Sequence, residues 1–149
     1  MHHRRKAREI ALQVLYALDV LEINAKEGME LFWNNFNAPE EARPFASTLI
    51  EGAWDNSKQI DELISTCSEN WTISRMSIVD KNILRMAVYE LLHFPDIPPK
   101  VTLNEAIDLG KMYGSENSGS FINGILDAIY IKLHMNNESQ SDAPVAHES

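Results

Sequence analysis

Apolar residues recur at three- and four-residue spacings along almost the whole of this chain, and that spacing is the period of an amphipathic helix. Near the N-terminus the apolar stripe runs through Ala7, Ile10, Val14 and Leu18. A half-buried strand alternates apolar and polar side chains every two residues, and no segment of the sequence does so. The sequence therefore predicts an all-α fold. The expected helices span residues 4–21, 27–37, 45–67, 77–93, 102–113 and 117–134.

Polar residues mark several expected helix ends. Ser77 and Asp80 have the spacing of a capping box, in which the first side chain accepts a hydrogen bond from a free backbone amide. Thr102 and Glu105 repeat that spacing and predict the start of the next helix. Gly114 follows this helix and is expected to end it in the left-handed conformation that favours glycine.

Gly110 and Gly124 fall inside predicted helices, where glycine costs about 1 kcal/mol relative to alanine. Gly110 and Gly124 are therefore expected where two helix backbones pass close together. Asn123 and Gly124 also form a hairpin dipeptide, but the apolar residues on both sides of it fit a helical face better. The tryptophans Trp33, Trp54 and Trp71 are expected in the core.

Charge is distributed very unevenly along the chain. The first eight residues contain four basic side chains and no acidic one, whereas residues 9–149 hold 9 Lys and Arg against 22 Asp and Glu, a net charge of −13. A cationic end on an anionic body predicts binding of a polyanion at that end alone. If Arg4, Arg5, Lys6 and Arg8 each contact a phosphate of a single strand, log K falls against log salt with a slope of about −3.

Length and composition indicate one globular domain over residues 1–135, because 44% of the 149 residues are hydrophobic. The tail at 136–149 is acidic and poor in apolar side chains, so we expect it to be disordered. The sequence has neither the apolar core of a signal peptide nor an apolar run long enough for a membrane span, which favours a cytoplasmic protein without membrane contact.

The sequence offers little for catalysis. It has no Walker loop, no dinucleotide-binding glycine motif and no zinc-protease motif, and its histidines are scattered. The single cysteine, Cys67, has no histidine at a sequence spacing that would indicate a catalytic pair. A buried or half-buried thiol is therefore favoured over a nucleophile. We therefore expect no catalytic residues, no metal and no cofactor.

Five segments, in this order, resemble the NusB family of bacterial transcription antitermination factors. They are RRKARE with ALQVLY at 4–16, DKNILRMAVYEL at 80–91, DIP at 96–98, NEAIDLGK at 104–111 and FINGILD at 121–127. The resemblance implies two small helical bundles packed together and a factor that is not an enzyme. It further implies binding of single-stranded boxA RNA from ribosomal RNA operons together with NusE, a small-subunit ribosomal protein, and indirect contact with other Nus factors and RNA polymerase.

The resemblance also assigns two surfaces. Tyr16 shares a helix with the basic cluster but lies more than two turns from Arg8, which places it nearer the protein partner. Gly119 and Ser120 stand where many relatives carry a basic or larger polar side chain. The implied RNA contacts are Arg4, Arg5, Lys6, Arg8, Lys111, Ser118, Gly119 and Ser120. The implied partner contacts are Tyr16, Asp80, Arg85, Glu90 and Phe121.

Other interpretations of these residues stay open on the sequence alone. Phe121 leads an apolar stripe and fits a core position, Asp80 fits a capping carboxylate, and Arg85 fits an ion pair with a neighbouring acid of its own helix. One alternative is a helical adaptor that binds only protein, in which the basic cluster at the N-terminus has no role in binding. An RNA-binding module of a ribosomal RNA-modifying system would need a second, cofactor-binding domain.

Overall fold

The computed structural model describes residues 2–68 and 72–148, with side chains described as far as residue 135. Within these ranges every regular element is helical, which confirms the predicted all-α class. The predicted core position of Trp71 lies outside the described residues, whereas Trp33 and Trp54 pack half-buried against the core. The elements are α1 (His2–Leu21), α2 (Ala25–Asn35), η1 (Glu40–Ala42), α3 (Arg43–Asp55), α4 (Ser57–Cys67), η2 (Ile73–Arg75), α5 (Ile78–His93), α6 (Pro99–Tyr113) and α7 (Ser118–Glu148).

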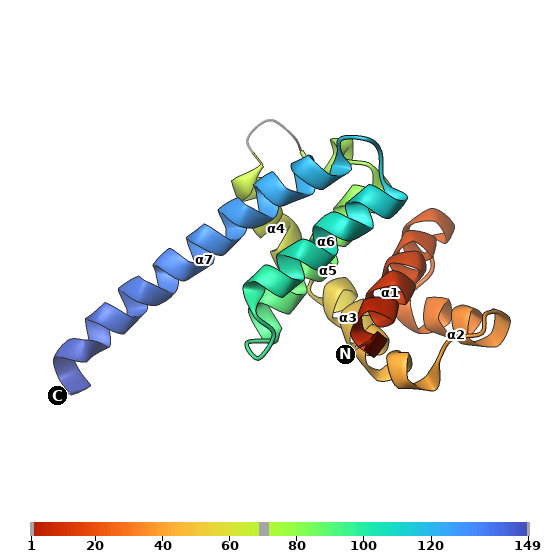
Figure 1. Cartoon of the computed structure of the whole chain (residues 1–149), viewed down its shortest axis with the longest axis horizontal. Helices are drawn as coiled ribbons and strands as arrows, with labels where there is room; N and C mark the ends of the chain where they lie inside the picture. The colour runs from red at the N-terminus through yellow and green to blue at the C-terminus, as the bar shows by residue number, and fades with distance from the viewer. Residues whose placement is uncertain (1, 69–71, 149) are drawn as a thin grey trace.

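The helices form two groups that meet at α5. Figure 1 shows α1, α2 and α3 together on one side of the molecule and α4, α6 and α7 on the other. Helix α5 packs against α1 and α3 of the first group and against α4, α6 and α7 of the second. This arrangement matches the expected pair of packed bundles, and it fixes the basic start of α1 against the second group.

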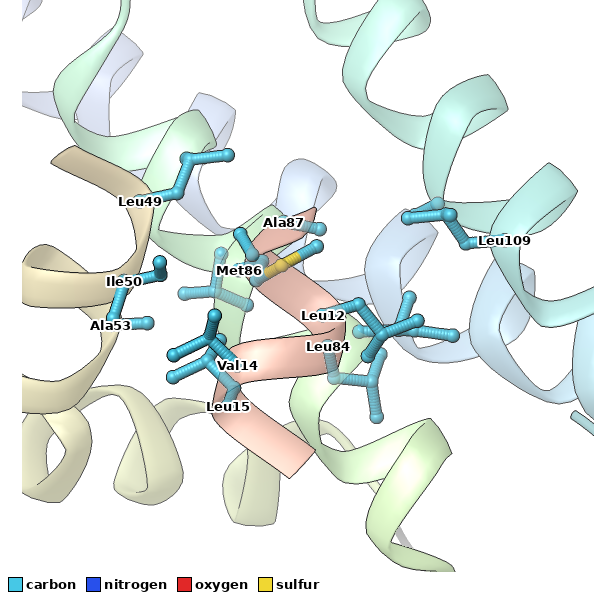
Figure 2. Packing of buried hydrophobic residues seen from close by; sticks show 14 of the residues in the cluster. Leu12, Val14, Leu15, Leu49, Ile50, Ala53, Leu84, Met86, Ala87 and Leu109 are labelled. Carbon is cyan, nitrogen blue, oxygen red and sulfur yellow. The ribbon is translucent and has the colours of Figure 1, made fainter. Parts of the chain in front are cut away.

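One apolar core runs through both groups. Figure 2 shows side chains from α1, α3, α5 and α6 meeting around the middle of α1. Leu49, Ile50, Ile83 and Leu84 are fully buried, as the helical spacing of apolar residues requires. Burial of such side chains contributes about 1.5–3 kcal/mol each, so the position of α1 is set by packing before any charge is considered.

The long helix predicted over 45–67 is wrong, because the structure divides it at Asn56 into α3 and α4. The side chain of Asn56 donates from Nδ2 to the carbonyl oxygen of Gly52 at 2.9 Å. Asparagine competes in this way with the backbone for helical hydrogen bonds. The apolar stripe gave no sign of the break, since Ile60 and Ile64 remain buried after it.

Of the two predicted capping boxes, one start is confirmed and the other is wrong. Ser77 precedes α5, and its Oγ accepts a hydrogen bond from the backbone amide of Asp80 at 3.0 Å. Thr102 instead lies inside α6, which begins at Pro99 because proline suits the first helical position. The Thr102 hydroxyl donates to Oε1 of Glu90 at 3.0 Å and serves a buried contact.

The three glycine predictions had different outcomes. Gly110 is confirmed at a close approach, since a Cβ there would lie 2.7 Å from Cδ1 of Ile122 on α7. Gly124 is not at one, because a Cβ there would meet nothing within 4 Å. Gly114 does end α6, but at φ −96° and ψ −161°, so the predicted left-handed conformation is wrong. A Cβ at Gly114 would overlap the side chain of Ser118.

We expect Gly124→Ala to raise the free energy of unfolding by about 0.5–1 kcal/mol, because alanine is the better helix former and finds open space there. Gly52→Ala is the matched comparison, since its Cβ would overlap the ring of Tyr89 and should cost about 1–3 kcal/mol. Urea denaturation of both variants measures the difference. A loss of stability in Gly124→Ala would contradict the assigned geometry.

The predicted disordered tail begins after Met135. Helix α7 runs on to Glu148, and Figure 1 shows its last turns extending away from the other helices. Side chains beyond residue 135 lie outside the described part of the chain, so the disorder of 136–149 stays a prediction. Among the described residues, no helix combines the length and apolarity needed to cross a bilayer.

Candidate nucleic-acid interface

The basic cluster lies in the first turns of α1, which runs alongside α6. Arg5 of α1 contacts Glu105 and Asp108 of α6. At the end of α6, burial of Tyr113 and the negative charge of Glu9 on α1 raise the pKa of the Tyr113 hydroxyl. The four basic side chains differ in exposure. The exposed fractions are 37% for Arg4, 58% for Arg5, 50% for Lys6 and 5% for Arg8.

Arg8 is buried in a network within the protein, so its predicted RNA contact is wrong. Its Nε donates to Oε2 of Glu90 at 2.7 Å and its Nη2 to Oε1 at 2.8 Å. Its Nη1 lies 3.6 Å from Oε1 of Glu105, and its guanidinium lies over the ring of Phe45, 5.4 Å from the ring centroid. Position 8 shares the face of α1 that carries Leu12, which is why this arginine points inward.

Glu90 is therefore not available to a partner, and that prediction is also wrong. Its two carboxylate oxygens are occupied by Arg8 and by the Thr102 hydroxyl. The side chain is 2% exposed, so a partner protein has no access to it. Arg8, Glu90 and Thr102 together connect α1, α5 and α6 from within.

Arg5 is exposed but already bound to two carboxylates. Nε and Nη2 donate to Glu105 at 3.1 and 2.9 Å, and Nη2 also donates to Oδ2 of Asp108 at 2.8 Å. The hydrogen bonds and charge of Glu105, and to a smaller extent Asp108, raise the pKa of Arg5, which remains a cation. Because exposed ion pairs contribute only about 0–1 kcal/mol, a phosphate group can compete for this guanidinium.

Arg4 and Lys6 are held more loosely. The Arg4 guanidinium lies 5.0 Å from the ring centroid of Phe45 and its Nη2 is 3.8 Å from Asp96. Nζ of Lys6 is 3.7 Å from Glu9. Both distances to carboxylates are long for charge-assisted hydrogen bonds, which are about 2.7–2.9 Å. The exposed start of α1 therefore presents three cations.

The second part of the predicted RNA surface lies where α6 ends and α7 begins. Lys111 is exposed one turn beyond Asp108, and Ser120 is also exposed. Ser118 is buried, and its Oγ accepts a hydrogen bond from the amide of Ser115 at 2.9 Å. Gly119 is covered by Lys111, whose Cγ would lie 3.2 Å from a Cβ there. Ser118 and Gly119 are therefore covered within the protein, and their predicted contacts with RNA stay predictions.

The predicted partner residues are only partly brought together. Asp80 and Phe121 line one cleft of about 270 Å³ between the starts of α5 and α7. Tyr16 is exposed one turn before Asp19, whose Oδ2 accepts a hydrogen bond from Asn82 near the same end of α5. The cleft also includes residues that sequence reasoning missed because no motif marks them. They are Arg75, Met76, Ser77, Ser115 and Asn117.

Asp80 is mostly buried beside this cleft, and its Oδ1 has no hydrogen-bond partner among the described residues. Oδ1 itself is closed to solvent, and an acceptor buried without a hydrogen bond is costly. Asp80 also lies in the first turn of α5, where a negative charge is favourable. Phe121 is half-buried against the core, which fits both interpretations of that residue.

Arg85 is largely covered and paired within the protein, and its predicted partner contact stays a prediction. Its Nε and Nη2 donate to the two oxygens of Asp61 on α4 at 2.8 and 2.7 Å. Its Nη1 lies 3.6 Å from Asp19 of α1. Arg85 therefore ties three helices together. Among the described residues, no group of three or more His, Cys, Asp or Glu side chains is arranged to hold a metal ion.

Comparisons with known proteins point to one family. A model of the NusB family matches residues 5–130. A relative from Syntrophus aciditrophicus, transcription antitermination protein NusB, is 67% identical over 144 residues, which is 97% of this chain and 89% of the relative. A protein of the same name from Desulforapulum autotrophicum is 47% identical over 133 residues, covering 88% of this chain and 93% of the relative.

Solved structures agree with that likeness. NusB from T. maritima superposes with a TM-score of 0.77 at 40% identity, covering 85% of this chain and 89% of that one. A crystal structure of antitermination factors NusB and NusE in complex with double-stranded RNA contains a chain with a TM-score of 0.79 at 32% identity. It covers 89% of this chain and 98% of that one.

Proposed function

Because this chain belongs to the NusB family of transcription antitermination proteins, we propose that it binds the single-stranded boxA element of nascent ribosomal RNA together with NusE. The exposed start of α1 carries this proposal. Arg4, Arg5 and Lys6 reach solvent there, and Lys111 is exposed on α6, on a body that is otherwise strongly acidic. The pair then acts with other Nus factors on RNA polymerase in the cytoplasm, through binding and without catalysis.

The few cations of this surface predict a modest affinity for RNA. Each phosphate contact to a single strand contributes about 0.7 to the salt slope. With Arg8 buried, α1 offers three contacts and a slope of about −2, and Lys111 brings it to about −3. The acidic body opposes RNA, so the protein alone should bind weakly. A basic partner that covers acidic surface would strengthen binding.

The cleft beside Asp80 supports the partner half of the proposal. A cationic side chain of NusE entering it would come close to the carboxylate of Asp80, whose negative charge would attract it. Phe121 lines the same cleft and Tyr16 is exposed at the same end of α5. Aromatic side chains of this kind commonly anchor protein interfaces.

A gel shift with the full chain, purified NusE and either boxA RNA or a scrambled RNA of equal length tests the proposal. We expect preferential binding of boxA RNA and a marked gain when NusE is present. Capture of NusE without any RNA binding would favour the protein-binding adaptor instead. Equal binding of both RNAs would contradict boxA recognition.

Neutralising Asp108 should strengthen RNA binding. Asp108→Asn keeps an oxygen acceptor for Arg5 but removes a negative charge close to the expected phosphate. A unit charge about 4–6 Å away in water is worth about 1 kcal/mol, so we expect RNA affinity to rise about three- to five-fold at low salt. Fluorescence anisotropy with labelled boxA RNA measures the change.

Glu30→Gln is the matched control, because it removes the same charge from α2, which packs against α1 and α3 and not against α6. Its effect on RNA affinity should stay below about two-fold. Weaker binding by Asp108→Asn would mean that the carboxylate mainly positions Arg5 and does not compete with phosphate.

A further inference from the structure

A second groove, with a volume of about 310 Å³, lies between the start of α6 and α7. It is lined by Pro98, Pro99, Lys100, Leu103, Asp127 and Tyr130. Pro98 also lines the hollow of about 260 Å³ beside Arg4 and Arg5. Pro98, in the turn before α6, is therefore shared by the groove and by the hollow at the basic start of α1.

The groove has the chemistry of a stacking platform. The ring of Tyr130 is half-buried and stacks on His134 with centroids 5.8 Å apart and an interplanar angle of 21°, which restricts its orientation. Leu103 and the two prolines supply apolar walls, and Lys100 is exposed. Proteins that bind single strands combine such an aromatic face for a base with a cation for its phosphate.

We propose that this groove binds one unpaired nucleobase of the same RNA strand, stacked on Tyr130, with Lys100 at its phosphate. This inference rests on the proposed RNA-binding function and extends the RNA surface beyond the start of α1. The position of Pro98 between the groove and the basic hollow, together with the positive charge of Lys100, favours RNA over a protein segment. The groove supplies a contact to a base. Sequence preference requires such contacts, because phosphate contacts are the same for every sequence.

Asp127 gives the groove a preference among bases. Its exposed carboxylate accepts hydrogen bonds only, so it fits a base with an exocyclic amino group. Adenine, cytosine and guanine carry such a group, and uracil does not. Uracil offers a carboxylate only its ring N3–H, so the groove should favour one of these three bases over uracil.

Anisotropy titrations of boxA RNA with the full chain and NusE test this site. Tyr130→Ala should weaken binding about 5- to 100-fold, the usual range for loss of one stacked base, with little change in salt slope. Tyr130→Phe should retain the affinity of the original protein. Lys100→Gln should reduce the magnitude of the salt slope by about 0.7, and because Lys100 is exposed this variant does not threaten folding.

Phe36→Ala is the matched control, since it removes an exposed aromatic ring from the end of α2, outside both proposed surfaces. Its RNA affinity should not change. If Arg4→Ala and Arg5→Ala weaken RNA binding while Tyr130→Ala and Lys100→Gln do not, the groove is not an RNA site and the proposed function stands. If Tyr130→Ala weakens capture of NusE alone, the groove binds protein and the inference is wrong.

A scan of single abasic nucleotides identifies the base. In the original protein, one abasic position should cost affinity, and that cost should disappear in Tyr130→Ala. Restoring uracil at this position should bind less well than restoring adenine, cytosine or guanine. An abasic cost that is unchanged by Tyr130→Ala at every position would overturn the inference.

Discussion

A Glu90→Gln variant is expected to lose about 3–5 kcal/mol of unfolding free energy, the usual cost of breaking a buried ion pair. Arg8 would keep its charge with only part of its hydrogen bonding, in a site that is closed to water. Thr102 would also lose a charged acceptor. Chemical denaturation followed by circular dichroism measures the loss.

Two further variants separate the buried pair from general charge effects. Arg8→Met combined with Glu90→Leu removes both charges and should recover much of the lost stability, because apolar side chains can replace a buried pair at little cost. Lys6→Ala removes an exposed cation from the same helix and should change stability by less than about 0.5 kcal/mol. A loss below about 1 kcal/mol in Glu90→Gln would contradict a buried, tightly paired Glu90.

Replacing Arg4 and Arg5 together with alanine should weaken the binding of boxA RNA by about 10- to 100-fold in the presence of NusE. Because both side chains are exposed, each contact should contribute about 0.7–1.4 kcal/mol, within the range of an ordinary net hydrogen bond. Stability should change little, because their ion pairs are exposed. Gel shifts and thermal melts on the same samples separate the two effects.

Arg8 must stay intact in that experiment. Its replacement would leave Glu90 buried and unpaired, and the resulting loss of folding would imitate a loss of RNA binding. Unchanged RNA affinity in the folded double variant would show that the start of α1 is not a phosphate contact.

Local patterns were sufficient to predict most of the fold. Apolar spacing located the helices, and Ser77 marked the start of α5, because both signals act within one or two turns. The break at Asn56 and the role of Thr102 were missed for a common reason. Each depends on a hydrogen bond that competes with, or mimics, an ordinary helical signal.

The candidate site was harder to predict because charge alone does not reveal burial. Arg8 was expected among the exposed cations, yet its partner Glu90 is 82 residues away in the sequence. One signal was present, since position 8 shares a helical face with Leu12 and Glu90 lies in a largely apolar helix. The ion pairs of Arg85 were equally hidden from the sequence, because its partners lie on two other helices. Exposed residues such as Arg4 and Arg5 were placed correctly in solvent.

The salt dependence of boxA RNA binding, compared between the original protein and the Arg4→Ala, Arg5→Ala double variant, tests the central claim most directly. Two lost phosphate contacts should reduce the magnitude of the slope of log K against log salt by about 1.4. Equal slopes for the two proteins would mean that these arginines do not meet the RNA backbone.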